Sequence, residues 1–297
     1  MPFSTSLSIA VIIASTGRPR ELAQWKQQLL AQTCQPDAVY LIVASQDDLP
    51  APDALPDDAR VLISPKGLTV QRNYGIDRTI DQFDIIAFFD DDYIASCRAI
   101  ENIRALFQDN ADLIAASGHL ILDGIGGRGH DYATALAAVS AYDAATPPPI
   151  WIRAHDSGVY GCNMAYRSSA IGDLRFDERL PLYGWLEDVD FGSRLLGRGM
   201  VAFTNAFAGV HQGVKSGRTS GVRLGYSQIA NPIYLYRKGT LRLRTALRRM
   251  TNNVGMNVLR ALYPEPWVDR AGRLRGNAKA FLDLMRGTLD PGRILDI

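Results

Sequence analysis

Cysteines, long apolar runs and an amino-terminal basic segment are scarce or missing in this 297-residue sequence. Its three cysteines lie far apart and form no C-x-x-C pair, which argues against a disulfide scaffold or a structural zinc site and favours a reducing compartment. No stretch approaches the roughly 18–20 apolar residues that a membrane-spanning helix requires. Residues 1–6 carry no basic side chain, and the apolar run Leu7–Ala14 is too short for a signal peptide. We therefore expect a cytoplasmic protein, attached to a membrane only peripherally, on its inner face.

The sequence also lacks a strong net charge, but its total of +1 hides an uneven distribution. Residues 1–236 hold 19 basic and 26 acidic side chains, whereas residues 237–297 hold 13 basic and 5 acidic ones. Because most of the chain is net acidic and no aromatic residues alternate with the basic ones of the tail, nucleic acid is not expected as a partner. The basic tail suggests an anionic surface instead.

Apolar residues of the tail recur every three or four positions, which predicts an amphipathic helix with arginines around its apolar face. In one interpretation this helix, over residues 240–263, lies on an anionic membrane surface. In the other it packs on the rest of the protein and its arginines are solvated. The apolar positions are Leu243, Leu247, Met250, Val254, Val258 and Leu262, and the arginines are Arg242, Arg244, Arg248, Arg249 and Arg260.

Strand-like and helix-like segments alternate along the chain, which predicts an α/β fold with a mostly parallel central sheet flanked by helices. We expect one domain over residues 1–236, in two halves (about 1–122 and 123–236), and a basic helical extension over 237–297. Residues 123–158 are expected to form a long excursion. Strands are predicted at 7–14, 38–44, 60–64, 85–89, 112–122, 161–166 and 200–203, and helices from residue 21 and at 69–82, 95–108 and 187–196.

Three consecutive carboxylates, Asp90, Asp91 and Asp92, follow the buried strand predicted at 85–89. They repel one another, and Mg²⁺ or Mn²⁺ is a natural counter-charge because carboxylate oxygens suit hard divalent cations. The alternative is a solvated acidic turn. Ligands of parallel sheets bind beyond the carboxyl ends of the strands, where both this triplet and the polar loop at 15–18 are expected, and this placement favours the metal.

Later segments carry candidate residues that each have an ordinary structural alternative. Glu187 and Asp188 stand in the first turn of a predicted helix, where the helix dipole alone favours acidic residues. His211 is a lone histidine, which is more often structural than a ligand. The glycine-rich loop that holds Lys215 and Arg218 is suited to closing over phosphates.

Five segments, each weak alone, together carry a resemblance to a known family. The first two hold small polar and basic residues, the third ends in the aspartate triplet, and the last ends in the Glu-Asp pair and a further aspartate. In this order and spacing they resemble the family 2 inverting glycosyltransferases of the GT-A fold, over residues 7–240. The segments are Ile13–Pro19, Gln71–Ile76, Ile86–Asp92, Gly161–Arg167 and Phe176–Asp190.

The resemblance implies a GT-A fold that is Rossmann-like, with a nucleotide-sugar half at about 1–122 and an acceptor half at about 123–236. It also implies a divalent cation, Mn²⁺ or Mg²⁺, as cofactor. Asp92, Asp90 and His211 would hold the metal, and Asp188 would be the general base for the acceptor hydroxyl. The residues implied at the acceptor are Trp185 and Glu187.

The donor side of the resemblance departs from the family at one position. Where the family often has a base-reading aspartate after the second strand, Ser45 stands here, so Asp47 takes that place only if the loop is shifted. The identity of the base therefore stays open. The residues implied around the nucleotide-sugar are Thr16, Arg18, Asp47, Arg72, Asn73, Asp90, Asp91, Lys215 and Arg218.

The implied function is that of a metal-dependent inverting glycosyltransferase, which moves a sugar from a nucleotide-diphosphate donor to a hydroxyl of a glycan or lipid-linked glycan, in bacterial surface polysaccharide assembly. The reaction needs cations for the leaving diphosphate and a carboxylate for the acceptor proton. Two alternatives stay open. One is a non-catalytic nucleotide- or glycan-binding module. The other, less favoured, is a D-x-D phosphatase with Asp90 as nucleophile, in which Ile94 departs from the motif.

Overall fold

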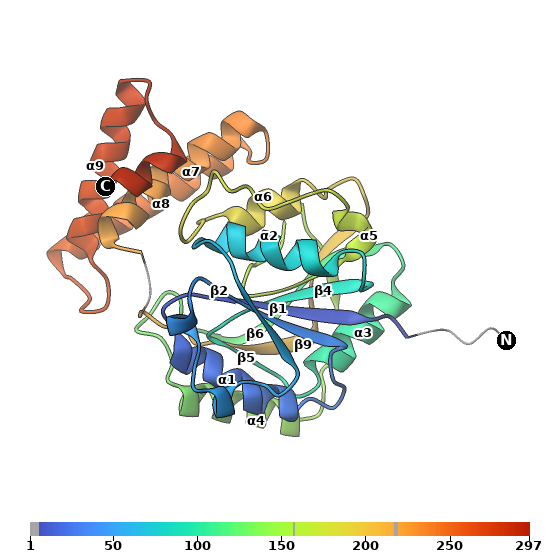
Figure 1. Ribbon diagram of the computed structural model, residues 1–297. Helices are drawn as coiled ribbons and strands as arrows, with labels where there is room; N and C mark the ends of the chain where they lie inside the picture. The colour runs from blue at the N-terminus through green and yellow to red at the C-terminus, as the bar shows by residue number, and fades with distance from the viewer. Residues whose placement is uncertain (1–5, 157, 217–218) are drawn as a thin grey trace. The chain divides into compact units, whose positions relative to one another are not determined.

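The computed structural model describes residues 6–156, 158–216 and 219–297, and the chain forms two compact units (Figure 1). The predicted division of the chain at residues 122 and 236 stays a prediction. The sheet unit comprises Met1–Lys66, Val70–Arg175 and Leu195–Gly217, and the helical unit comprises Gly67–Thr69, Phe176–Arg194 and Arg218–Ile297.

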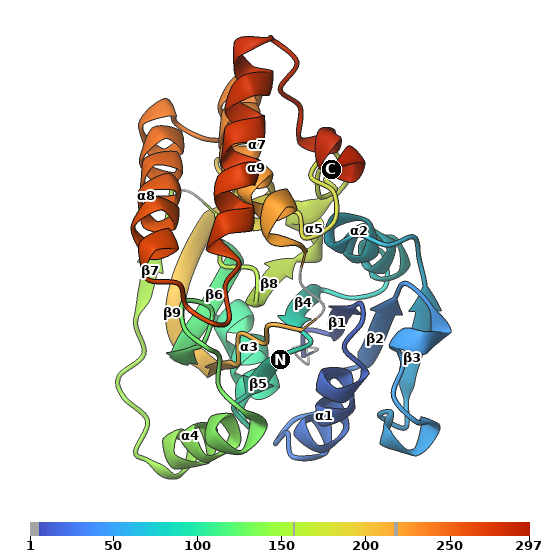
Figure 2. The ribbon, with the colours of Figure 1, turned by 90° about the vertical axis from the view of Figure 1, so that its left-hand side faces the viewer.

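One nine-stranded sheet forms the centre of the sheet unit, in the order β3-β2-β1-β4-β8-β6-β9-β5, with β7 paired to β9 (Figure 2). Strands β1 to β4, β6 and β9 run in one direction, and β5, β7 and β8 run in the other. This arrangement confirms the predicted α/β fold with a mostly parallel central sheet flanked by helices. The strands are β1 Ile9–Ser15, β2 Ala38–Val43, β3 Ala59–Ile63, β4 Ile85–Asp90, β5 Tyr93–Ala95, β6 Leu113–Asp123, β7 Ile152–Ala154, β8 Asn163–Arg167 and β9 Met200–His211.

Helices cover both faces of this sheet because its central strands are apolar on both sides. Ile9, Val11 and Ile13 of β1 belong to a core cluster with residues of α1 and α3, which lie with α4 on one side of the sheet (Figure 1). On the other side a Cβ at Gly75 would lie 2.8 Å from Ile12 Cγ2, so glycine allows α2 to approach β1. The helices are α1 Pro19–Leu30, α2 Leu68–Thr79, α3 Ala99–Asp109, α4 Tyr132–Ala144 and α5 Ser168–Ile171, with short 3₁₀ helices η1 Gln46–Asp48 and η2 Pro52–Ala54.

The helical unit packs α7, α8 and α9 around a separate core of Tyr226, Ile229, Met250 and Ala280. Helices α7 and α9 approach closely at glycines, since a Cβ at Gly225 would lie 2.1 Å from the Arg273 carbonyl oxygen of α9. Among the residues that the structure describes, none of the helices combines the length and the apolar character needed to span a bilayer. The elements are α6 Glu187–Ser193, α7 Gly221–Lys238, α8 Leu243–Leu262, α9 Arg270–Met285 and η3 Pro291–Asp296.

One strand prediction and one helix prediction require correction at the far edge of the sheet. The strand predicted at 200–203 continues as β9 to His211, and the helix predicted from residue 95 begins only at Ala99, after the short strand β5. Thr204 and Asn205 interrupt the apolar pattern of β9, but both side chains are hydrogen-bonded to backbone carbonyls, of Trp151 and Pro149. The extra length matters because it carries His211 to the same edge of the sheet as the aspartate triplet.

Candidate metal and nucleotide site

The aspartate triplet lies at the carboxyl ends of two neighbouring parallel strands. Ala14 of β1 pairs with Asp90 of β4, so the loop after β1 lies beside the residues that follow β4. Ser15 Oγ donates a hydrogen bond of 2.7 Å to Asp91 Oδ2, and Arg18 Nη1 donates one of 2.8 Å to Asp91 Oδ1. The strand-end rule thus correctly placed the 15–18 loop and the triplet together.

Each aspartate of the triplet has its own partners. Buried Arg72 donates from Nη2 to Asp90 Oδ1 at 2.9 Å and to the Gly161 carbonyl at 2.9 Å. Asp92, which is 1% exposed, accepts a hydrogen bond of 2.8 Å from the backbone N–H of Val214. His211 Nε2 lies 3.5 Å from Asp92 Oδ1. Asp91 and Asp92 are buried and Asp90 is half-buried, so the triplet is not the solvated acidic turn that was the alternative.

Asp90, Asp92 and His211 form a group that could hold a metal ion, since each offers one ligand atom and these atoms lie within 4.8 Å of one another. Two carboxylates and an imidazole form a donor set that suits Mn²⁺ and related divalent cations. The sequence resemblance named these same three residues. Asp90, Asp92 and His211 come together because β9 pairs with β6 along its whole length. At its last residue, His211 is the partner of Asp123.

The electrostatics of the triplet indicate an excess of buried negative charge. Burial raises the pKa of Asp90, and burial raises the pKa of Asp91 to about 7 although Arg18 acts against it. Burial also acts upward on Asp92, but its hydrogen bond and attraction to His211 lower the pKa of Asp92 to about 2. Burial acts downward on His211, whereas Asp123 and Asp92 raise the pKa of His211 to about 10. A cation at this place would relieve the repulsion.

The loop after β9 is tied to the triplet through Arg18. Arg18 donates from Nε to the Ser216 carbonyl at 2.9 Å and from Nη2 to the Val214 carbonyl at 3.2 Å. Lys215 Nζ lies 3.0 Å from the Gly124 carbonyl oxygen and 3.1 Å from that of Ile125. The described part of the loop therefore contacts Arg18 through its backbone and the residues after β6 through Lys215. Arg218, the other basic residue named for this loop, lies outside the described residues.

The residues predicted on the nucleotide side lie in the loop after β1, in η1 and in α2. Thr16 Oγ1 donates to Gln71 Oε1 at 3.2 Å, and Gln71 Nε2 in turn donates to the carbonyls of Ser15 and Ile42 at 2.8 Å each. Asn73 follows Arg72 on α2 and is buried. Gln71 thus joins the ends of β1 and β2, a role that the sequence did not predict.

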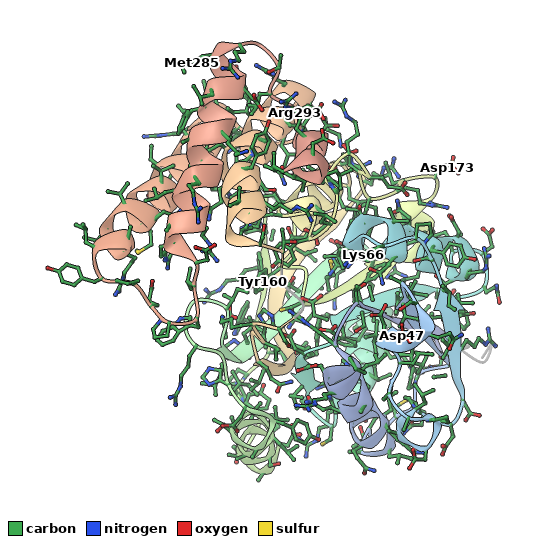
Figure 3. All side chains as sticks on the ribbon, turned by 60° about the vertical axis from the view of Figure 1, so that its left-hand side comes forward. Asp47, Lys66, Tyr160, Asp173, Met285 and Arg293 are labelled. Atoms are coloured by element: carbon green, nitrogen blue, oxygen red, sulfur yellow. The ribbon has the colours of Figure 1, made fainter. Side chains whose placement is uncertain are left out.

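Asp48, and not its neighbour, is the buried carboxylate of the loop after β2. Its Oδ1 accepts from the backbone N–H of Gly17 at 2.6 Å, and its Oδ2 accepts from those of Ala44 and Ser45 at 3.0 and 2.9 Å. Asp47 is exposed to solvent (Figure 3). Asp48 was missed by sequence reasoning, although the spacing Ser-x-x-Asp is a capping pattern that could have indicated it.

Trp185, Glu187 and Asp188 belong to the helical unit, in a turn with unusual backbone angles. Leu182, Gly184 and Leu186 all have positive φ, of 60°, 61° and 76°. Left-handed conformations at residues other than glycine are strained, and such strain clusters at functional sites. Glu187 is buried, whereas Asp188 is half-buried and its Oδ1 accepts from the Val189 N–H at 2.7 Å.

Helices α7 and α8 support this turn. Asn231 of α7 donates from Nδ2 to the Trp185 carbonyl at 2.8 Å. Ala246 of α8 packs in one apolar cluster with Leu186 and Val189, which flank the acidic pair. Burial lowers the pKa of Arg249, one turn along α8, and the charge of Asp188 acts against that shift. The basic helix α8 thus lies beside the proposed general base.

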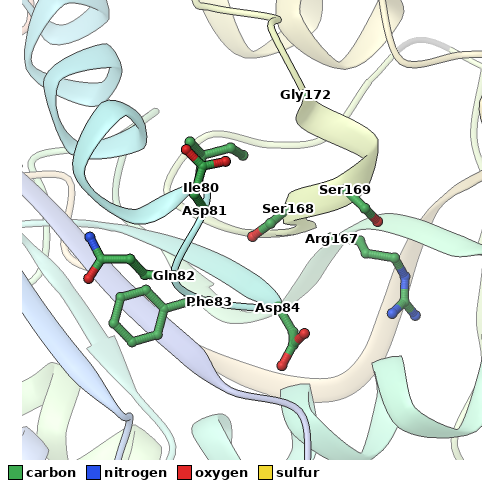
Figure 4. Close-up of a pocket in the computed structure, with 9 residues that line it drawn as sticks. All are labelled: Ile80, Asp81, Gln82, Phe83, Asp84, Arg167, Ser168, Ser169 and Gly172. Carbon is green, nitrogen blue, oxygen red and sulfur yellow. The ribbon is translucent and has the colours of Figure 1, made fainter.

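A separate cavity of about 410 Å³ lies away from this site, at the amino-terminal end of β4 (Figure 4). Residues 80–84 precede β4, and residues 167–172 begin at the last residue of the antiparallel strand β8. The cavity therefore lies at the amino-terminal end of β4, whereas the triplet lies at its carboxyl end. It is therefore not part of the candidate site. Its lining includes Asp81, Asp84, Arg167 and Ser168.

No protein-family model and no curated protein matches the chain. Solved structures that are similar to it do exist. TarS of S. aureus is similar in structure, with 14% identity, a TM-score of 0.46, and coverage of 76% of this chain and 40% of TarS. A structure of GalNAc-T7 with UDP, GalNAc and Mn²⁺ is similar with 12% identity, a TM-score of 0.49, and coverage of 88% of this chain and 59% of that one. The chain thus spans less than two thirds of either protein.

Proposed function

We propose that the protein is a metal-dependent glycosyltransferase that moves a sugar from a nucleoside-diphosphate donor to a hydroxyl acceptor. The observation that carries the proposal is the convergence of Asp90, Asp92 and His211 within 4.8 Å, beside Arg18 and Arg72, at the ligand-binding edge of the sheet. Buried carboxylates with a histidine and arginines form a site for a cation and for an anion such as a diphosphate.

The donor would be held between the triplet and the basic loop. A bound divalent cation, Mn²⁺ or Mg²⁺, would stabilise the negative charge that develops on the leaving diphosphate. Arg18 and Lys215, with Arg218, supply cationic side chains toward the same phosphates, and Asp91 faces the ribose or the metal. The remaining donor contacts in this proposal are Thr16, Asp47, Arg72 and Asn73.

The acceptor would bind at the strained turn of the helical unit. Asp188 takes the proton of the acceptor hydroxyl as the new glycosidic bond forms, while Trp185 and Glu187 orient the acceptor. Direct in-line attack from the face opposite the leaving group inverts the anomeric centre, with no covalent enzyme intermediate. We infer membership of the family 2 inverting enzymes, with a glycan or lipid-linked glycan of a bacterial surface polysaccharide as acceptor.

A thermal-shift panel of UDP, GDP, dTDP and CMP, each with and without Mn²⁺, tests the donor part of the proposal. We expect one nucleoside diphosphate to raise the melting temperature in a Mn²⁺-dependent manner. If none of the four does so, the donor site is wrong. The panel also identifies the base, which the departure at Ser45 leaves open.

Asp188→Asn separates an enzyme from a binding module. We expect this variant to bind the nucleotide identified by the panel with unchanged affinity and to lose transfer and donor hydrolysis. Glu178→Gln, a change of another carboxylate in the helical unit, serves as the control. Full activity of Asp188→Asn would show that another group is the base.

The proposal includes an anionic membrane surface as partner of residues 240–263. Met250 is buried in the helical core, so the middle of the predicted apolar face is docked, whereas its ends are exposed. Leu259 and Leu262 are 57% and 73% exposed, and α8 carries four arginines and no acidic residue. Apolar side chains next to arginines suit a lipid interface with anionic headgroups.

Vesicle flotation of variants that keep helix α8 in place tests whether this surface binds an anionic membrane. Leu259→Ser combined with Leu262→Ser should reduce binding to vesicles that contain phosphatidylglycerol, whereas Leu30→Ser with Ile150→Ser, equally exposed changes in the sheet unit, should not. Equal flotation of all variants, or no flotation of the unaltered protein, would refute the membrane surface.

A further inference from the structure

Asp123 is a residue to which the sequence analysis gave no role. It is the last residue of β6, and the pairing of β6 with β9 places it directly opposite His211. The distance between Asp123 Oδ1 and His211 Nδ1 is 2.9 Å. The same carboxylate accepts a hydrogen bond of 3.2 Å from the Tyr160 hydroxyl at Oδ2 and one of 3.0 Å from the Ile125 N–H at Oδ1.

This contact determines what His211 can offer to a cation. A carboxylate accepts hydrogen bonds and donates none, so the Nδ1 of His211 must carry a proton to satisfy Asp123. In the neutral imidazole the lone pair is then on Nε2, which lies 3.5 Å from Asp92 Oδ1 within the group that could hold a metal.

We propose that Asp123 is a positioning residue of the metal site, which holds His211 in the tautomer and orientation that present Nε2 to the cation, and that Tyr160 holds Asp123 in turn. This inference rests on the proposed metal site and assigns residues outside its ligand set. Carboxylates that accept from the second nitrogen of a ligating histidine are a general device for fixing such ligands.

The turn that follows Asp123 also positions the phosphate side of the site. The Gly124 N–H donates to the His211 carbonyl at 2.8 Å, and the carbonyls of Gly124 and Ile125 accept from Lys215. A Cβ at Gly124 would lie 2.0 Å from the Gln212 carbonyl oxygen, so only glycine permits this approach. Residues 123–125 therefore fix both the histidine of the metal site and the lysine of the basic loop.

Asp123→Asn tests the assignment at nearly constant size. The amide can present its NH₂ group to His211 Nδ1, which favours the tautomer with the proton on Nε2, where it blocks ligation. We expect the affinity for Mn²⁺ alone, measured by calorimetry or by EPR of free Mn²⁺, to fall by roughly 10- to 100-fold. Asp173→Asn, an exposed carboxylate of the same unit, should leave it unchanged.

The tautomer itself gives a readout that a purely structural role would not alter. In the Mg²⁺-loaded protein with ¹⁵N-labelled histidine, His211 should be protonated at Nδ1 only. In Asp123→Asn, Nε2 should carry the proton in a large share of molecules. Tyr160→Phe removes one hydrogen bond to Asp123, keeps the carboxylate, and should weaken Mn²⁺ binding only a few-fold. This milder variant keeps the inference testable if Asp123→Asn does not fold.

The outcomes separate this inference from the proposed function. Should Asp123→Asn bind Mn²⁺ like the unaltered protein while His211→Ala loses binding, Asp123 has no positioning role and the metal site stands. Should Asp123→Asn fail to fold and Tyr160→Phe bind Mn²⁺ without loss, the inference is likewise overturned. Should the unaltered protein bind no Mn²⁺ or Mg²⁺, the metal site fails and the inference fails with it.

Discussion

Each unit of the molecule contains a cluster of buried and half-buried carboxylates, and neighbouring cations balance the charge of the two clusters differently. In the helical unit, Asp177 and Asp190 share Lys238, and Asp190 also contacts Arg194 at 3.1 Å and Thr240 at 2.7 Å. Two carboxylates there face two cations. We call this pair the helical-unit cluster.

In the sheet unit, the triplet forms the rim cluster. Among the described residues, its three carboxylates form ion pairs with Arg18 and Arg72, and His211 must be neutral when it ligates a metal. Burial raises the pKa of Asp90 and raises that of Asp91 to about 7, although His211 lowers the pKa of Asp92 to about 2, whereas in the helical unit the pKa of Asp177 is lowered. A balanced cluster stabilises the fold, and an unbalanced one indicates a place for a cation.

Asp90→Asn is the change with the largest expected effect, and it acts on function. We expect donor turnover to fall by roughly 10³-fold and the Mn²⁺-dependent thermal shift to disappear, because a ligand of the metal is lost. The metal-free free energy of unfolding should change by no more than about 1 kcal/mol, since burial raises the pKa of Asp90 and its charge therefore adds little to the stability of the fold. Chemical denaturation and donor hydrolysis measure the two quantities. A large loss of metal-free stability would contradict the comparison.

Asp190→Asn should have the opposite effects, a loss of stability with no change in metal binding. Asp190 is fully buried, and its removal leaves Lys238 and Arg194 without one of their counter-charges. We expect the free energy of unfolding to fall by about 3 kcal/mol. The affinity of the folded protein for Mn²⁺ should not change. If this variant is as stable as the unaltered protein, the helical-unit cluster does not have the structural role that its balance suggests.

The rim cluster could be predicted from sequence because it follows from local patterns and one topological rule. Asp90, Asp91 and Asp92 end an apolar strand, Arg18 lies in the loop after the first strand, and parallel strands bring such ends together. The pairing of His211 with the triplet came from the family resemblance alone. These predictions needed no knowledge of side-chain partners.

The partners of the site residues could not be predicted, because they depend on strand register. Asp123 meets His211 only because the pairing of β6 and β9 shifts register at three places before their last residues, and a shift of one residue turns a side chain to the other face of the sheet. The choice of Asp48 over Asp47 depends in the same way on the turn that η1 makes. Neither effect leaves a periodic pattern in the sequence.

The smallest expected effect concerns the pH dependence of the helical-unit cluster. Burial acts upward on Asp177, but hydrogen bonds from Lys238 and Tyr234 lower the pKa of this carboxyl group. A carboxyl group whose pKa is lower in the folded than in the unfolded state adds stability above its unfolded value of about 3.9, and this stability is lost as the pH falls through the folded value. Asp177→Asn should therefore reduce the free energy of unfolding by about 1 kcal/mol at pH 7 and progressively less below pH 4.

Urea unfolding of both proteins between pH 3 and pH 7 measures this difference. Asp173→Asn, which replaces an exposed carboxylate, should show little loss of stability at any of these pH values. A loss for Asp177→Asn that is independent of pH would mean that shape and hydrogen bonding, and not charge, explain the role of Asp177. In that case the two clusters would differ in packing. The balance of charges would then no longer distinguish a structural cluster from a cation-binding one.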